Sequence, residues 1–442
     1  MEDGGFALAG YTTSFGDGSA DIWLVRTDDE GEVIWSQTYG GDGWDDCYSA
    51  IRTSEGGFAL AGATNTGLDS GFNMYFVVTN EDGDVIISES YSELEWNGCY
   101  SVFQTADSGF ILAGSTRESV LGPTDILLIK VNENGEEQWT QTFGGDGLDR
   151  CDTVIQTDDG GFLLGGYSES PDGDRGQGWV SKTDENGEEV WDNTVGGSSG
   201  KTSILQIENE EYLIARYTGT FHERSAGFLL TMADSDGDTL WTEKYQRLGR
   251  LTCTSLIKTQ DNGFAIAGDR YLGIQEDIFL FIDLVRSDSD GNEQWSGSYG
   301  DENQNVCLSL CQSNDGRYGL AGIGRDNIDA QKDFLLIVTE PDPTIVKSDN
   351  KRQLTQDYFI LSAYPNPFNS TTNIYYRLPN PSNIKFKVFD SSGRQLFVLF
   401  DGVKAAGLHS IPIEISGLHS GSYFVSLQSG SQSQAHEITL LK

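Results

Sequence analysis

The feature that most constrains this chain is a repeat of about 52 residues, marked in each copy by a glycine-rich segment such as GGFALAG at residues 56–62. The aromatic residue of this segment recurs at Phe6, Phe58, Phe110, Phe162, Tyr212, Phe264 and Tyr318. The steps between successive members are 52, 52, 52, 50, 52 and 54 residues. A fixed period of this length, without a helical pattern inside it, predicts a radial array of small sheets.

Each full copy contains four strand-like segments, represented from first to fourth by residues 48–53, 57–62, 21–27 and 33–39. In the second segment large side chains alternate with alanines, which is the period of a β-strand. The third segment is matched by residues 125–130 and 277–281. A sheet with one bulky face and one small face is expected to stack well on copies of itself.

A tight turn separates the third and fourth segments of each full copy, and it ends in a glycine that can supply the positive φ of a hairpin. These glycines are Gly31, Gly83, Gly135, Gly187, Gly237 and Gly291. The fourth segment carries a tryptophan at Trp35, Trp139, Trp191, Trp241 and Trp295, whereas the second copy has Ile87 at this position.

This layout resembles bacterial β-propeller repeats and, in strand order, the kelch and WD-repeat families. The shared features are a glycine-ended second strand, an aspartate that opens the third strand and a tryptophan in the fourth. The chain departs from both families, because it lacks the kelch double glycine and the Trp-Asp pair. The resemblance implies an all-β fold with a seven-bladed β-propeller over residues 1–343. It implies little about activity, since propellers support many unrelated functions.

The first and last copies of the repeat are incomplete. Copy one lacks its first segment, and copy seven ends with its third segment at residues 333–339. One leading segment of roughly 20 residues would supply both missing strands and close the ring. No basic and apolar leader precedes the first repeat. We therefore expect the natural N-terminus, with an N-terminal signal peptide, to be missing from this sequence. The alternative is that residues 344–347 fill the last outer strand.

The composition changes after Pro343, where residues 344–357 form a polar linker. Residues 358–442 contain short strand-like runs separated by turn signals, which predicts a β-sandwich. The runs are residues 358–363, 372–378, 384–389, 395–400, 409–415, 422–428 and 435–441.

The second domain contains spaced motifs: YPNPFN at 364–369, IKFKVFD at 384–390 with SGR at 392–394, LHSGSYF at 418–424 and ITLLK at 438–442. Together they resemble the type A C-terminal sorting domain of the type IX secretion system of Bacteroidetes. His436 and Glu437 stand where that family usually has a basic pair. The resemblance implies that the type IX secretion machinery is a partner. It also implies that the chain is secreted or attached to the outer-membrane surface, with the domain cleaved after export.

The net charge is −40, and it is uneven. From Thr344 onward the chain has 9 Lys and Arg against 6 Asp and Glu, so the propeller region carries nearly all of the negative charge. Such a surface repels nucleic acid and anionic membranes, which excludes them as partners. No run approaches the ~18 apolar residues of a transmembrane helix, which excludes a transmembrane segment.

We assign no catalytic, cofactor-binding or metal-ligating residue from the sequence. Five of the six cysteines, Cys47, Cys99, Cys151, Cys253 and Cys307, share one repeat position. Equivalent positions of neighbouring blades are too far apart for a disulfide. We expect these five and Cys311 to be free, small and buried. Residues 234–238 and 288–292 begin like calcium loops, but neither has the glutamate expected at loop position 12. We attribute both to turn chemistry.

A binding face, if present, is expected on the loops that follow the fourth and second strands, because these loops diverge on a regular scaffold. They are residues 92–98 with Trp96, 114–124, 166–178, 218–227 with His222 and Arg224, and 270–276 with Tyr271. The alternative is that these are only variable solvent loops.

The leading functional hypothesis is a secreted or cell-surface protein for binding or adhesion, with a polysaccharide or another surface protein as ligand. The competing hypothesis is an extracellular polysaccharide lyase or hydrolase with its site at the channel mouth. A third is a purely structural surface protein. No catalytic motif stands out, which favours binding over catalysis.

Overall fold

The structure of the 442-residue chain is a computed structural model. It describes residues 4–65, 71–92, 94–119, 122–169, 176–195, 201–218, 225–248, 250–274, 277–299, 306–324, 333–339, 359–364, 371–378, 382–390, 394–404, 407–414, 418–429 and 432–440. The chain divides into two compact units, Met1–Lys347 and Ser348–Lys442. The division falls within residues 344–357.

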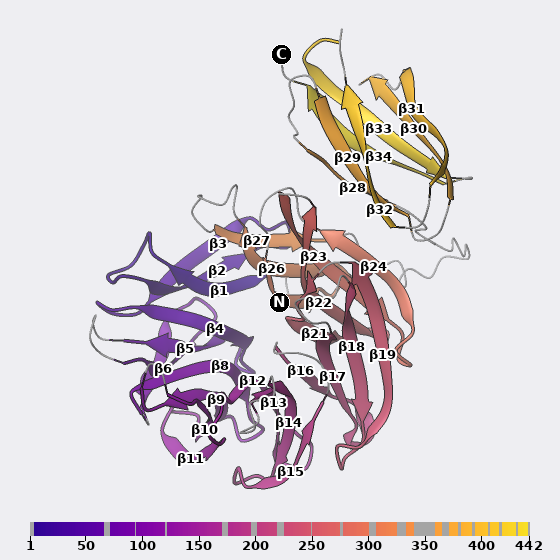
Figure 1. The fold of residues 1–442 in the computed structure, drawn as a ribbon. Helices are drawn as coiled ribbons and strands as arrows, with labels where there is room; N and C mark the ends of the chain where they lie inside the picture. The colour runs from indigo at the N-terminus through magenta and orange to yellow at the C-terminus, as the bar shows by residue number, and fades with distance from the viewer. Residues whose placement is uncertain are drawn as a thin grey trace. The chain divides into compact units, whose positions relative to one another are not determined.

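The described residues of the first unit form seven antiparallel sheets, named here sheets 1 to 7 in chain order (Figure 1). Sheet 1 contains β1 (Ala7–Thr12), β2 (Asp21–Thr27) and β3 (Val33–Tyr39). Sheet 2 contains β4 (Asp45–Arg52), β5 (Phe58–Thr64), β6 (Asn73–Thr79) and β7 (Val85–Tyr91). Sheet 3 contains β8 (Trp96–Gln104), β9 (Phe110–Arg117), β10 (Asp125–Val131) and β11 (Glu137–Phe143). Sheet 4 contains β12 (Arg150–Gln156), β13 (Phe162–Ser168), β14 (Gln177–Thr183) and β15 (Glu189–Thr194).

The remaining three sheets follow the same order along the chain. Sheet 5 contains β16 (Ser203–Gln206), β17 (Tyr212–Thr218), β18 (Ser225–Ala233) and β19 (Thr239–Leu248), with a short 3-10 helix at Glu208–Glu210. Sheet 6 contains β20 (Arg250–Leu251), β21 (Ser255–Lys258), β22 (Phe264–Ile274), β23 (Asp277–Ser287) and β24 (Glu293–Tyr299). Sheet 7 contains β25 (Val306–Gln312), β26 (Tyr318–Gly324) and β27 (Asp333–Val338).

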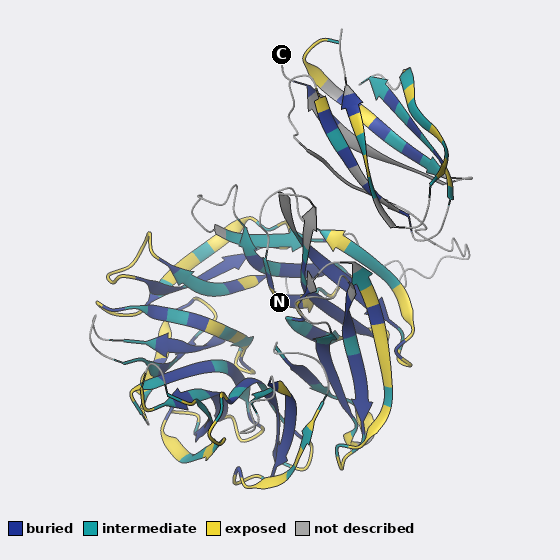
Figure 2. Cartoon of the chain, in the orientation of Figure 1, coloured by how far each residue is buried: buried dark blue, intermediate teal, exposed yellow. Residues whose placement is uncertain are grey.

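The seven sheets close into a ring. Each sheet shares a hydrophobic cluster with the next one. Sheet 7 packs on sheet 1, where Phe334 stacks on Trp23 with ring centroids 4.6 Å apart and Phe6 lies in the same cluster. The first strands contact one another around the axis, while the outer strands and the turns carry most of the exposed residues (Figure 2). The predicted all-β propeller is confirmed, and the blade number stays a prediction.

Two repeat signatures of the sequence meet at the junctions where the preceding sheet carries a fourth-strand tryptophan. The fourth-strand tryptophan packs against the marker aromatic of the following sheet, as in the pairs Trp35–Phe58, Trp139–Phe162, Trp191–Tyr212 and Trp295–Tyr318. The same tryptophan lies over the hairpin glycine of that sheet. A side-chain carbon on Gly187, for example, would stand 2.7 Å from the Trp139 ring. Gly187 has a φ of 79°, so both the turn and the packing require glycine.

The terminal sheets have three strands each in the described part of the chain. Among the described residues, sheet 1 has no strand beyond β1 on the side of the axis, and sheet 7 has none beyond β27 on the outer side. Residues 344–347, the alternative outer strand, lie outside the described residues.

Sheet 6 corrects the predicted register. Ile282 pairs with Tyr299 as Ile22 pairs with Tyr39, so residues 281–287, and not 277–281, are equivalent to 21–27. The reason is that β22 and β23 continue past the usual strand ends and pair residue by residue as far as Ile274 and Asp277. Most of the predicted loop at residues 270–276 is therefore strand.

The cysteines are free, as expected, and five of them are buried. The prediction was wrong for Cys311, which is exposed. In sheet 2 the equivalent position, Ile51, packs into the cluster shared with sheet 3. Cys311 lacks such a cover because sheet 1, the sheet that follows it, has no first strand among the described residues.

The second unit is a sandwich of two antiparallel sheets. One contains β28 (Phe359–Tyr364), β29 (Thr371–Leu378) and β32 (Gly407–Glu414). The other contains β31 (Gln395–Lys404), β30 (Ser382–Asp390), β33 (Gly421–Ser429) and β34 (Gln432–Leu440). Both sheets contribute to one core, in which Tyr376 of β29 packs on Phe386 of β30 with ring centroids 4.7 Å apart. The predicted β-sandwich is confirmed.

Candidate functional site

The propeller unit has two ends with different connections. At the hairpin end, tight turns join first to second strands and third to fourth strands. At the loop end, longer connections follow the second and fourth strands. Isolated parallel bridges join these connections across the junctions, such as Phe72 with Trp96 and Thr124 with Leu148. These bridges fix where the third strand of one sheet and the first strand of the next begin.

The first strands carry β-bulges near the loop end. The register shifts between Cys47 and Ser49, Cys99 and Ser101, Cys151 and Thr153, and Cys307 and Ser309. A bulge leaves one residue outside the ladder and redirects its side chain. The bulged residues are Tyr48, Tyr100, Asp152 and Leu308, so one repeat position presents different chemistry from sheet to sheet.

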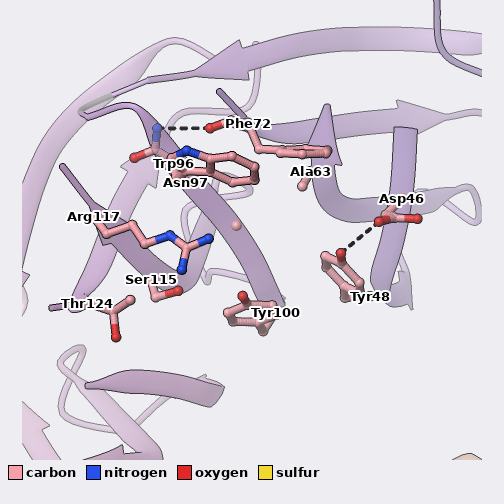
Figure 3. A pocket seen from close by; sticks show the side chains of 11 residues that line it. Asp46, Tyr48, Ala63, Phe72, Trp96, Asn97, Tyr100, Ser115, Arg117 and Thr124 are labelled. Carbon is pink, nitrogen blue, oxygen red and sulfur yellow. Dashed lines mark hydrogen bonds between the residues drawn. The ribbon is translucent and has the colours of Figure 1, made fainter. Parts of the chain in front are cut away.

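A pocket of about 250 Å³ opens at the loop end between sheets 2 and 3 (Figure 3). Four aromatic rings and several polar groups line it. The lining residues are Asp46, Tyr48, Ala63, Phe72, Trp96, Asn97, Gly98, Tyr100, Ser115, Arg117 and Thr124.

The aromatic rings of the pocket form two touching pairs. The Tyr48 and Tyr100 rings, both at bulges, have centroids 5.3 Å apart, and the Phe72 and Trp96 rings have centroids 5.0 Å apart. Tyr48 is 47% exposed, so its ring is presented to solvent. The pocket therefore offers flat apolar surfaces beside polar groups, which suits a ligand with both kinds of surface.

A cationic group faces the pocket from β9. The Arg117 guanidinium lies 4.9 Å from the centroid of the Trp96 ring. No carboxylate in the described part of the chain forms an ion pair with Arg117. Its planar donor fork remains available for a ligand.

Asp46 is the carboxylate among the described lining residues. Its Oδ2 accepts a hydrogen bond of 2.8 Å from the Tyr48 hydroxyl, and its Oδ1 is buried without a hydrogen bond. The partial burial of Tyr48, followed by the nearby Asp46 charge, raises the pKa of its phenol. Tyr48 is therefore poorly suited to remove a proton from a substrate near neutral pH.

A second charged group lies beside the pocket at the bulge of sheet 4. Arg150 Nε donates to Asp152 Oδ1 at 2.7 Å, and its guanidinium lies 5.8 Å from the Tyr100 ring centroid. Burial raises the pKa of Asp152 against the opposing pull of Arg150. The paired Arg150 guanidinium therefore lies beside the Tyr100 ring.

The pocket joins two of the segments that sequence reasoning nominated. Trp96, Asn97 and Gly98 come from residues 92–98, and Ser115, Arg117 and Thr124 come from residues 114–124. Much of these two segments is strand, because β8 begins at Trp96 and β9 continues to Arg117. Tyr271 lies in β22, and His222 and Arg224 lie outside the described residues. Sequence reasoning missed Tyr48 and Tyr100, although their place after the repeated cysteine is the signal that could have identified them.

The hairpin end is held by a repeated contact. Lys182 Nζ, in a side chain that is 5% exposed, lies 2.8 Å from Asp159 Oδ2, and Lys130 lies 3.0 Å from Asp107 in the same way. A hollow of about 420 Å³ borders Asp159 and Lys182. Because its cation, Lys182, is already paired with Asp159, we regard the hollow as structural.

The acidic turns are also structural. Asp234 Oδ1 accepts the backbone N–H groups of Asp236 and Asp238, at 3.1 and 2.9 Å, and Asp288 does the same in its own turn. The described residues contain no group of three or more His, Cys, Asp or Glu side chains placed to hold a metal ion. Within the same residues, no helix has the length and hydropathy of a membrane span.

The second unit can be placed in a family. Residues 362–440 match the secretion system C-terminal sorting domain. The chain carries a type IX secretion sorting domain. This sorting domain indicates a secreted or surface protein that engages the type IX machinery. No curated protein sequence matches the chain.

Several solved structures are similar to the chain at low identity. One is a protein of unknown function from Bacteroides caccae, with 16% identity, coverage of 67% of this chain and 94% of that one, and a TM-score of 0.42. Another is PorZ, a surface component of the type IX secretion system of Porphyromonas gingivalis, with 11% identity, coverage of 96% and 64%, and a TM-score of 0.39. A third is Sqt1 from Chaetomium thermophilum, with 12% identity, coverage of 84% and 91%, and a TM-score of 0.42.

Proposed function

We propose that the propeller unit is the ligand-binding part of a protein carried to the cell surface by its sorting domain, and that its loop end binds carbohydrate. The observation that carries this proposal is the pocket between sheets 2 and 3, where aromatic rings, an arginine and an amide converge (Figure 3).

Carbohydrate matches this chemistry because a sugar ring has apolar C–H faces and polar hydroxyl edges. The rings of Tyr48, Tyr100 and Trp96 supply flat surfaces on which a sugar face can rest. Arg117 supplies paired donors for a sugar carboxylate or for neighbouring hydroxyls. Tyr and Trp side chains have only two rotatable bonds each, so a ligand that rests on them orders few side-chain torsions.

Binding is favoured over hydrolysis by the acid groups at the pocket. Most glycosidases use two carboxyl groups across the scissile bond. Asp46 is the carboxylate among the described residues that line this pocket, and one of its oxygens is engaged by Tyr48. A lyase that used Tyr48 as its base is disfavoured by the raised pKa of that residue.

The test is a glycan array probed with the full chain, beside an assay for polysaccharide degradation. We expect binding without degradation, and loss of about tenfold in affinity for Trp96→Ala and for Tyr100→Ala, the effect of about 1.4 kcal/mol for one lost aromatic contact. Leu308→Ala is the matched control, because Leu308 occupies the same bulge position in sheet 7, is 50% exposed and lies outside the pocket.

Two outcomes would contradict the proposal. Degradation of a bound polysaccharide would favour the enzyme hypothesis. Unchanged binding by both aromatic variants, or no binding to any glycan, would remove the pocket as a carbohydrate site.

A further inference from the structure

Two pairs of aspartates meet at the loop end, one at the junction of sheets 1 and 2 and one at the junction of sheets 3 and 4. Asp21 begins β2 and Asp45 begins β4, while Asp125 begins β10 and Asp149 lies immediately before β12. In each pair, one aspartate lies at the start of the third strand of a sheet. The other lies at or just before the start of the first strand of the following sheet. The second aspartate of each pair lies in a similar segment, YGGDGWDD at residues 39–46 and FGGDGLDR at residues 143–150, and the two segments share the pattern Gly-Gly-Asp-Gly-x-Asp.

The two carboxylates of each pair converge on a glycine. A side-chain carbon on Gly40 would stand 2.3 Å from Asp45 Oδ2 and 2.7 Å from Asp21 Oδ1. A side-chain carbon on Gly144 would stand 2.2 Å from Asp125 Oδ1 and 3.0 Å from Asp149 Oδ2. Both carboxylates of a pair therefore lie beside the same glycine, where any side chain would collide with both of them.

Three of these four carboxylates are buried, Asp125 is half-buried, and none has a counter-charge among the described residues. Asp21, Asp45 and Asp149 are 3%, 1% and 3% exposed. In the described part of the chain, no Lys, Arg or His side chain forms an ion pair with any of the four aspartates. Buried charges are normally paired or bound to metal, because an uncompensated one is costly.

Asp149 gives the sharpest sign of a missing partner. Its carboxylate faces that of Asp125 across Gly144. Oδ2 accepts the backbone N–H of Gly145 at 3.0 Å, but Oδ1 is buried and receives no hydrogen bond from the described residues. Burial, followed by the charge of Asp149, raises the pKa of Asp125, and burial also raises that of Asp21. Asp149 Oδ1 is thus a buried acceptor that needs either a hydrogen-bond donor or a cation.

The junction between sheets 2 and 3 provides an internal comparison, because both aspartates are replaced by asparagines. Asn73 and Asn97 occupy the equivalent positions. Asn97 Nδ2 donates to the carbonyl oxygen of Phe72 at 3.2 Å (Figure 3). It also donates to the carbonyl oxygen of Leu94 at 2.7 Å. The amide N–H₂ of Asn97 therefore bridges two acceptor oxygens at this junction. The residue equivalent to Gly40 is Ser92 here, so this junction does not require a glycine.

The same carbonyls are present at the aspartate junctions. Ala20 O and Thr124 O are equivalent to Phe72 O, and each accepts a 2.8 Å hydrogen bond from the backbone N–H of Asp45 or Asp149. A carbonyl oxygen has a second lone pair. At the two aspartate junctions, a carboxylate therefore stands where the junction of sheets 2 and 3 has the Asn97 amide. The carbonyl oxygen there has no side-chain N–H donor of this kind among the described residues.

We propose that each aspartate pair binds a calcium ion between two carboxylates and a backbone carbonyl. Calcium accepts six to eight oxygen ligands in flexible geometry, including carboxylates, carbonyls and waters, whereas magnesium requires a stricter octahedron. Two carboxylates also neutralise a divalent ion. The ions would fasten the connections on either side of the pocket, whose lining residues Asp46 and Thr124 each adjoin one of the pairs. The proposal does not depend on what the pocket binds.

The experiment is calcium titration of the full chain by calorimetry after removal of divalent ions, in physiological salt so that diffuse binding to the acidic surface is screened. We expect one ion per aspartate pair, with affinity in the range of about 0.1–1 mM typical of extracellular modules. Calcium should raise the melting temperature, while magnesium at the same concentration should not replace it.

The variants localise the sites. The double substitution Asp125→Asn with Asp149→Asn reproduces the natural asparagine pair and should remove one bound ion while leaving a folded chain. Asp146→Asn is the matched control, because Asp146 is an exposed acid in the same segment. It should leave the number of bound ions unchanged.

Three results would overturn the proposal. The first is the absence of calcium binding and of any thermal shift at millimolar calcium. The second is an unchanged stoichiometry in the double variant. The third is an equal loss in Asp146→Asn, which would mean that calcium binds only through diffuse surface charge.

Discussion

The two ends of the propeller unit hold their carboxylates in opposite ways. At the hairpin end, hydrogen bonds from Thr157 and Lys182 outweigh partial burial and lower the pKa of Asp159. Asp107 is held in the same way by Thr105 and Lys130. The charged form of these acids is favoured by the fold.

At the loop end, the balance is reversed. Burial raises the pKa of Asp269 to about 6, despite hydrogen bonds from Cys307 N and Thr252 Oγ1. The pKa values of Asp21, Asp125 and Asp152 are also raised, with burial as the largest cause. The hairpin end thus uses charge to stabilise the repeat, whereas the loop end keeps charge at a cost. Unfavourable charge of this kind often marks functional positions.

The largest predicted effect concerns Asp269. A carboxyl whose folded pKa is raised contributes stability that is complete below its ordinary pKa of 3.8 and is lost as the pH rises through about 6. Asp269→Asn should remove this pH dependence and stabilise the chain above pH 7 by on the order of 3 kcal/mol. Denaturant unfolding at pH 4 and pH 7.5 measures the difference. Equal pH dependence in the variant and the parent chain would contradict the assignment.

An intermediate effect is expected at the hairpin end. Lys182→Met keeps the apolar stem but leaves Asp159 without its cation. Because Asp159 is half-exposed, we expect a loss of about 2 kcal/mol in the free energy of unfolding, below the usual cost of breaking a fully buried pair. Lys258→Met is the control: its 3.7 Å contact with Glu208 lies at the surface, and the loss should be under about 1 kcal/mol. Equal losses of unfolding free energy in Lys182→Met and Lys258→Met would show that the buried lysine contributes no more than the surface one.

The smallest effect, and the one of opposite sign to Asp269, is predicted for Asp159→Asn. A carboxyl whose folded pKa is lowered contributes stability above its ordinary pKa, and this contribution is lost as the pH falls through the folded value. The variant should therefore lose less stability than the parent chain between pH 5 and pH 3, by under about 1 kcal/mol because the site is half-exposed. Melting temperatures across this pH range provide the measurement. A steeper acid loss in the variant would show that the two ends do not differ as described.

Much of the scaffold could be predicted from the sequence because its signals are local and repeated. The marker aromatics, the hairpin glycines and the fourth-strand tryptophans each recur at one position, and the structure brings them together at junctions where the preceding sheet carries that tryptophan. The strands of the sandwich were also predictable, because alternating apolar runs indicate strands and the turn residues between them indicate where each strand ends. The strand extension in sheet 6 was missed, because strand ends depend on pairing with a partner as well as on local propensity.

The pocket could be predicted only in part. Divergence between copies pointed to residues 92–98 and 114–124, but it did not indicate Tyr48 and Tyr100. In a regular strand, a side chain points to one of the two faces of the sheet. At a bulge the side chain is redirected, so the alternating pattern does not predict where Tyr48 and Tyr100 point. A bulge depends on the register of two strands, and the register is invisible in one strand alone.

The sequence alone determined the periodic scaffold and the export signal, because the repeat and the sorting motifs are each written within short stretches of chain. Only the tertiary structure decided which side chains share a junction, as with Asp125 and Asp149 or with Tyr48 and Tyr100. The reason is that closing the ring joins residues from different copies, and their charge and burial then depend on neighbours more than 20 residues away.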